Sequence, residues 1–223
     1  DLKISTKEIQ IKDLISLTRI VKGSPQLFVL DNITKAGLIY ANINLTFDLD
    51  GEIKNNYQIN GGIKKAKFNI FNQVEIENLN LSFDISKNQL TLRKIETDLN
   101  SIKLKSPLIK IEEKKNIFFI DGKVINDQQN FDINKLKPIL GDLLSTIETE
   151  KIDFDSINTF SFNMNKNLKL NDLKLETNLN LKNFKIVKNP LNLKTFLPNY
   201  TEQVKFEDHK IKIKLTKDIL DIK

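Results

Sequence analysis

The chain has 223 residues and a formal net charge of +6, and it is 39% hydrophobic, 29% charged and 8% aromatic. It has no cysteine and a single histidine, His209, which excludes disulfides, cysteine nucleophiles and metal sites built from thiolates or several histidines. No apolar run approaches the roughly 18 residues of a membrane-spanning helix. Because the first residue is Asp1 and not Met, we expect a mature or excised piece of a longer protein.

The basic charge does not indicate a nucleic-acid partner. Only two of the 35 basic residues are arginine, Arg19 and Arg93, although arginine is favoured for bidentate recognition of phosphate and guanine. The lysine excess accompanies many isoleucines and asparagines, as an AT-rich coding sequence would produce. We therefore expect no nucleic-acid binding.

The first predicted element is a short amphipathic helix from Asp13 to Val21. Apolar residues recur there at helical spacing, and Gly23 and Pro25 are expected to end the helix. We expect this helix to cover an edge of the structure that follows.

Period-two alternation, which is typical of strands with one apolar and one polar face, begins at Ile39. The apolar positions of this first run are Ile39, Ala41, Ile43, Leu45, Phe47 and Leu49. Asp50 and Gly51 then favour a tight reversal, because both residues tolerate positive φ. In the next run, Gly61 and Gly62 indicate a bulge or a bend.

Further short alternating runs follow, with a phase change of one residue before Leu79 and a turn at Lys87 and Asn88. The charged segment from Glu112 to Lys115 is predicted to be a hairpin loop. The segment from Asp132 to Thr149 has helical spacing, although Pro138 should restrict or kink that helix. It is the one plausible internal boundary. Alternation then resumes, and the segment from Pro190 to Pro198 is expected to cover the core.

We predict twelve to fourteen strands and a mainly β fold. The apolar faces could pack together as a sandwich or solenoid, or face lipid in an outer-membrane barrel, or line an open groove. The barrel is disfavoured because the chain has no Trp and three Tyr, too few for aromatic girdles. A solenoid should show a fixed repeat, which we do not find.

The alternation of apolar and polar residues resembles that of the AsmA-like family of Gram-negative envelope proteins, of the YhdP and TamB type. The resemblance covers nearly the whole chain and rests on pattern, since the family has no sharp catalytic or binding motif. The segments that carry it are residues 37–40 through 50–51, 57–61, 78–83, 119–124 and 170–175. It implies a long, strongly curved antiparallel sheet (a U-shaped β-groove) with one or two short amphipathic helices, forming one groove segment over residues 1–223.

The resemblance also implies that this segment moves phospholipid along an apolar groove between the inner and outer membranes, in the periplasm. An inner-membrane anchor outside this chain and envelope proteins at the groove ends would be its partners. The expected lining residues are Ile43, Leu45, Phe47, Ile59, Phe68, Ile70, Leu81, Phe83, Leu92, Ile120, Phe162, Leu175 and Leu179. We expect no cofactor, metal or catalysis, since neither His209 nor the paired Asp153 and Asp155 lies in a recognisable catalytic pattern. The alternative is a closed structural or adhesive β-domain without a small-molecule ligand.

Overall fold

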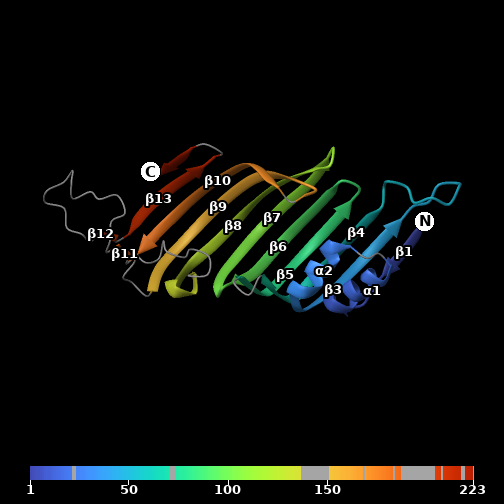
Figure 1. Ribbon diagram of the computed structural model, residues 1–223, viewed down its shortest axis with the longest axis horizontal. Coiled ribbons are helices and arrows are strands. Elements are labelled where there is room, and N and C mark those ends of the chain that lie inside the picture. Colours follow the sequence, from blue (N-terminus) through green and yellow to red (C-terminus); the bar gives the residue numbers. More distant parts are fainter. Residues whose placement is uncertain are drawn as a thin grey trace.

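The computed structural model contains a long, open antiparallel sheet with two helices near one end (Figure 1). It describes residues 1–21, 24–70, 74–136, 151–167, 169–182, 184–186, 204–206, 208–216 and 219–222. The expected fold class, a mainly β chain built on one curved antiparallel sheet with two short helices, is confirmed.

The elements follow one another as a meander. The described helices are α1 (Ile11–Val21) and α2 (Pro25–Ile33), and η1 (Ile133–Leu136) is a 3-10 turn. The strands are β1 (Leu2–Ser5), β2 (Ile9–Gln10), β3 (Thr34–Leu45), β4 (Gln58–Ile70), β5 (Val74–Ser86), β6 (Gln89–Leu99), β7 (Ile102–Lys114), β8 (Ile117–Asp132), β9 (Lys151–Asn165), β10 (Leu170–Lys182), β11 (Phe184–Ile186), β12 (Val204–Phe206), β13 (His209–Leu215) and β14 (Leu220–Ile222).

The main sheet has the strand order β1-β3-β4-β5-β6-β7-β8-β9-β10-β13-β14, with β2 also paired to β3. β11 and β12 form a separate pair. The sheet is open, because its path ends at β1 and β14, which lie toward opposite ends of the long axis in Figure 1. β8 and β9 pair directly, so the described strands on both sides of the expected boundary belong to one sheet.

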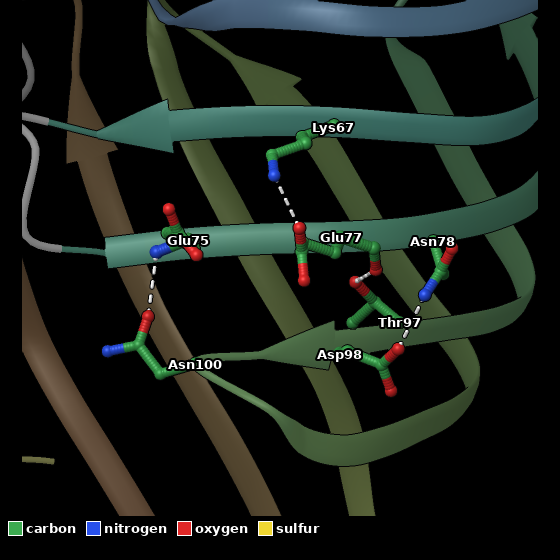
Figure 2. Close-up of polar contacts among 7 residues, drawn as sticks. All are labelled: Lys67, Glu75, Glu77, Asn78, Thr97, Asp98 and Asn100. Carbon is green, nitrogen blue, oxygen red and sulfur yellow. Dashed lines mark hydrogen bonds and ion pairs between the residues drawn. The ribbon is translucent and has the colours of Figure 1, made fainter. Parts of the chain in front are cut away.

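Bulges bend most of the long strands. The register shifts in the β3–β4, β4–β5, β5–β6, β7–β8, β8–β9 and β9–β10 pairs. Lys65, Asn78, Lys94 and Asp172 have positive φ within strands. A bulge inserts a residue and increases the local twist, and Asn78 accounts for the predicted phase change before Leu79. In Figure 2 the later strands cross behind β4–β6 at a steep angle, as a strongly twisted sheet requires.

Of the bulge or bend predicted at Gly61 and Gly62, the bulge is wrong. Both residues pair with β3 in an unbroken register, and the shift lies between Ile63 and Ala66. Gly62 is needed for a different reason: a Cβ atom there would lie 2.7 Å from the hydroxyl of Tyr40. The glycine makes room for an aromatic ring on the neighbouring strand.

The first helix and the first strand differ from their predicted bounds. α1 begins at Ile11, and Pro25 does not end a helix but begins α2. Proline fits that first helical position because its missing N–H is not needed there, and the Ser24 side chain caps the helix by accepting from the Leu27 N–H at 3.2 Å. β3 ends at Leu45, so Leu49 lies in the following loop, where the predicted reversal at Asp50 and Gly51 is present.

Several predicted short strands are continuous. β7 passes through Pro107, which lies at the register shift, where a backbone N–H is not needed for the ladder. β7 also runs to Lys114. The loop predicted at residues 112–115 is therefore a turn at Lys115 and Asn116.

The helix predicted from Asp132 to Thr149 is described only at its beginning. Asp132 ends β8 and η1 follows, while residues 137–150 lie outside the described residues. The Pro190–Pro198 segment also lies outside them.

Asn100 closes the β6–β7 turn and extends the ladder toward β5 (Figure 2). It has positive φ, its side-chain oxygen accepts from the Glu75 N–H at 2.7 Å, and its backbone N–H donates to the Glu75 carbonyl at 2.9 Å. We predict that Asn100→Ala lowers the free energy of unfolding by about 1–3 kcal/mol, because it removes a hydrogen bond and strains the turn. Urea denaturation followed by circular dichroism measures this.

The control separates backbone strain from hydrogen bonding. Asn100→Gly keeps the positive φ and loses only the side chain, so its loss should be smaller than that of the alanine variant. Asn116→Gly, at the exposed β7–β8 turn with φ 64°, should change stability little. Equal urea midpoints for Asn100→Ala and the parent would contradict this role.

Candidate functional site

One face of the sheet, here called the apolar face, carries two continuous rows of mostly apolar residues. Directly paired residues project to the same side, so the register identifies the members of each row. The first apolar row is Ile4, Ile43, Ile59, Ile85, Leu90, Ile111, Ile120 and Phe162. The second apolar row is Ala41, Gly61, Phe83, Leu92, Ile109, Gly122, Phe160, Leu175 and Leu215.

The rows are long and reach solvent. The second row crosses eight strand-to-strand steps of about 4.8 Å, roughly 38 Å in total, which exceeds the hydrocarbon thickness of a bilayer, about 30 Å. Most of its side chains are half-buried, whereas the interior of a packed core is fully buried. The apolar face is therefore not a dry core along these rows.

The structure brings twelve of the thirteen predicted lining residues onto this one face. Seven of them lie in the two rows: Ile43, Ile59, Ile120, Phe162, Phe83, Leu92 and Leu175. Leu45, Leu81, Phe68, Ile70 and Leu179 lie on the same face at other levels, and Phe47 forms an isolated bridge with Ile53 just beyond β3. Phe83 and Ile120 are buried and the other eleven are half-buried.

Two glycines in the second row lie beneath aromatic rings, a feature that sequence reasoning missed. A Cβ atom on Gly61 would lie 2.8 Å from the Phe83 ring, and one on Gly122 would lie 2.8 Å from the Phe160 ring. Each ring thus fills the space that its glycine leaves. The Phe160 and Phe162 rings stack with centroids 6.0 Å apart. The aromatic residues keep the rows continuous where side chains are missing.

A polar cluster interrupts the apolar face beside the second row. It comprises Asn126, Ser156, Asn158 and Thr177, which occupy apolar-face positions of β8, β9 and β10. Asn126 is buried and donates to the Phe154 carbonyl at 3.2 Å, and Asn158 donates to the Val124 carbonyl at 3.3 Å. The cluster adjoins the β8–β9 bulge, where side-chain amides can bond carbonyls that the ladder does not pair. Alternation alone did not reveal it.

α1 packs against the apolar face and not along a sheet edge as predicted. Ile11 and Ile15 are buried together with Ala66, and Ile39, Ile63, Phe68 and Leu79 pack around them. Gly37 permits this contact, because it has φ +134° and a Cβ atom there would lie 2.8 Å from Ile11 Cδ1. α1 therefore covers the level next to the second row and leaves the two rows themselves uncovered.

The opposite face is mostly polar and is held by cross-strand pairs (Figure 2). Lys67 on β4 pairs with Glu77 on β5, and Asn78 donates to Asp98 on β6 at 2.7 Å. The hydrogen bond to Glu77 raises the pKa of Lys67. Near the other end of the sheet, the hydrogen bond from Lys212 lowers the pKa of Glu176. All these groups are solvated, so the pairs favour strand register more than they stabilise the fold.

The described part of the chain contains no group of three or more His, Asp or Glu side chains that could hold a metal ion. His209 is exposed on β13, and Asp155 accepts a hydrogen bond from Asn180 at 2.6 Å on the polar face. Among the described helices, none is long and apolar enough to cross a bilayer.

Comparison with known proteins returned no matching family model, no matching curated protein and no matching solved structure.

The close contact between Gly122 and the Phe160 ring can be tested by substitution. We predict that Gly122→Ala lowers the free energy of unfolding by about 1–3 kcal/mol, because the new methyl group overlaps Phe160 and Ile109, whose Cγ1 would lie 2.9 Å away. Phe160→Leu in the Gly122→Ala background should recover part of the loss. Urea denaturation of the two single variants and the double variant measures the coupling. Additive losses would show that the ring and the glycine are independent.

Proposed function

We propose that this chain binds the acyl chains of phospholipids on its apolar face and lets them slide along the two apolar rows. A single observation carries the proposal: both rows are continuous over most of the sheet, and most of their residues are half-buried and not fully buried. A soluble protein rarely leaves so extended an apolar surface without a ligand or partner.

The energetics favour an acyl chain as the occupant. Each methylene group moved from water to an apolar surface contributes about 0.8 kcal/mol. An acyl chain spans about half of the 30 Å hydrocarbon core, so the second row has room for more than one chain end to end. The headgroup would remain in water. Because the rows consist of Ile, Leu, Phe, Ala and Gly without a charged side chain, the energy should change little as a lipid moves.

The polar cluster and α1 restrict the path. Both adjoin the second row on the same side. α1 covers the level of Ile39 and Ile63 near one end, and the polar cluster lies farther along, at the level of Val124, Asn158 and Thr177. A hydrocarbon chain at the polar cluster would forgo contacts with apolar side chains and cover amide groups. The lipid path in this proposal therefore follows the two rows.

The cellular setting of the proposal rests on the AsmA-like resemblance alone. On that basis we propose a non-enzymatic segment of a periplasmic lipid-transfer protein in a Gram-negative envelope, working between the inner and outer membranes. Inner-membrane attachment through a segment outside this chain, and envelope proteins at the groove ends, belong to the same proposal. A closed structural β-domain is the competing account, and the binding experiment separates the two.

Lipid binding can be tested with a charge placed in the second row. We predict that purified protein takes up a fluorescent phospholipid and that Leu92→Asp and Leu175→Asp each weaken uptake by about tenfold or more, because each removes apolar contacts and places a charge beside the lipid. Titration by fluorescence, together with native mass spectrometry of the lipid adduct, measures this.

Ile157→Asp is the matched control. Ile157 is an exposed apolar residue of β9 on the opposite face, paired with Ile125. Its substitution should leave uptake unchanged, and circular dichroism should show the parent fold in all three variants. An equal loss for Ile157→Asp, or a parent protein that takes up no lipid, would contradict the proposal, and the latter would favour the closed structural domain.

A further inference from the structure

The α1–α2 pair exposes a large apolar surface that the lipid-binding proposal does not use. Leu17, Ile20 and Val21 of α1 are 60%, 82% and 82% exposed, and Phe28 and Val29 of α2 are 56% and 51% exposed. These five residues are here called the helical patch. Concentrated exposure of large apolar side chains on two adjacent helices marks a docking surface.

The two sides of α1 have different partners. Ile11 and Ile15 face the sheet, where they are buried. At about 100° per residue, the three patch residues of α1 lie roughly 120° or more around the helix axis from Ile15. The patch is thus the side of α1 that the sheet does not cover.

α2 exposes apolar side chains in several directions. Leu27, Phe28, Val29 and Leu30 are consecutive, so their side chains span about 300° around the axis, and none is buried. The polar residues Gln26, Asp31 and Asn32 lie between them around the axis, so no single apolar stripe forms. A rigid protein partner would cover one stripe, whereas the fluid interior of a membrane interface can surround the helix from several sides at once.

The patch is held as one unit. Arg19 on α1 pairs with Asp31 on α2 and lies over the Phe28 ring at 5.5 Å. Thr34 donates to the Leu30 carbonyl at 2.6 Å and ties the end of α2 to β3. Because both helices are fixed in this way, the apolar side chains present a single surface.

Position and charge favour a membrane. α1 and α2 lie near one end of the elongated sheet in Figure 1, so a flat surface can reach them there. The basic residues Lys12, Arg19, Lys22 and Lys35 outnumber the acidic residues Asp13 and Asp31 over residues 11–35, and since Arg19 and Asp31 pair with each other, a net charge of +2 remains. Cationic side chains around an apolar helical surface are typical of helices that lie in a bilayer interface beside anionic lipids.

We propose that the helical patch docks this end of the sheet onto the surface of a phospholipid bilayer, with α1 and α2 lying in the interface and not crossing it. This inference does not depend on acyl-chain binding by the two rows.

The absence of tryptophan from the chain allows a direct test. Ile20→Trp and Phe28→Trp each introduce a single tryptophan into the patch, and vesicles of phosphatidylethanolamine and phosphatidylglycerol serve as the probe. We expect the emission to move to shorter wavelength when vesicles are added, and brominated lipids to quench it. Leu49→Trp, at a fully exposed loop position, is the control and should show neither effect.

A second pair of variants tests the contribution of the patch to binding. Ile20→Asp combined with Val21→Asp should reduce co-sedimentation with the same vesicles at least about tenfold, since each substitution removes a side chain from hydrocarbon. Uptake of fluorescent phospholipid in the absence of vesicles should be unchanged, which separates failure of docking from failure of the lipid-binding proposal.

Three outcomes would overturn the inference. They are unchanged tryptophan emission at both patch positions, an equal response at Leu49→Trp, and a shift that depends on protein concentration without vesicles. The last would assign the patch to contact between two copies of the chain.

Discussion

The register of the antiparallel ladder is the constraint on which this structure depends. A slip of one residue would turn the apolar side of a strand to the polar face. Bulges impose such a change within a strand, yet the apolar face continues past them because neighbouring strands bulge at similar levels. Lys65 and Asn78 are one example: beyond them Ala66 still pairs with Leu79, and Phe68 pairs with Ile76. Matched bulges therefore bend the sheet and keep its two faces distinct.

Most of this sheet has no second layer among the described residues, so the usual stabilisation by a buried core is restricted to one region. At α1 the contacts of Ile11 and Ile15 with Ala66 form a small two-layer core. Elsewhere the strands are held by backbone hydrogen bonds, by half-buried side chains paired across strands, and by polar-face pairs such as Lys67 with Glu77. An open apolar surface is compatible with folding because each strand is paired on both sides along most of the sheet.

Alternation was sufficient to predict the mainly β fold and the common face of the lining residues, because period two fixes which side chains share a face. It could not predict that β7 continues through Pro107, since a proline at a bulge costs the ladder nothing. It also missed α2: Pro25 was interpreted as a helix end, although the preceding Ser24 supplies a cap. Asn126 and Asn158 could not be predicted, because the carbonyl partner of each lies on the neighbouring strand, 28 and 34 residues away in the chain.

The two proposed surfaces meet at α1. Its inner side covers the level of Ile39 and Ile63, next to the second row, while Ala41 and Gly61 of that row lie beyond its contacts. The outer side of the same helix carries part of the helical patch. If a bilayer binds that patch, its hydrocarbon lies within one helix diameter, about 10 Å, of the end of the apolar rows. A lipid could then exchange one apolar surrounding for another over a short distance, which makes α1 the element through which docking would assist lipid entry.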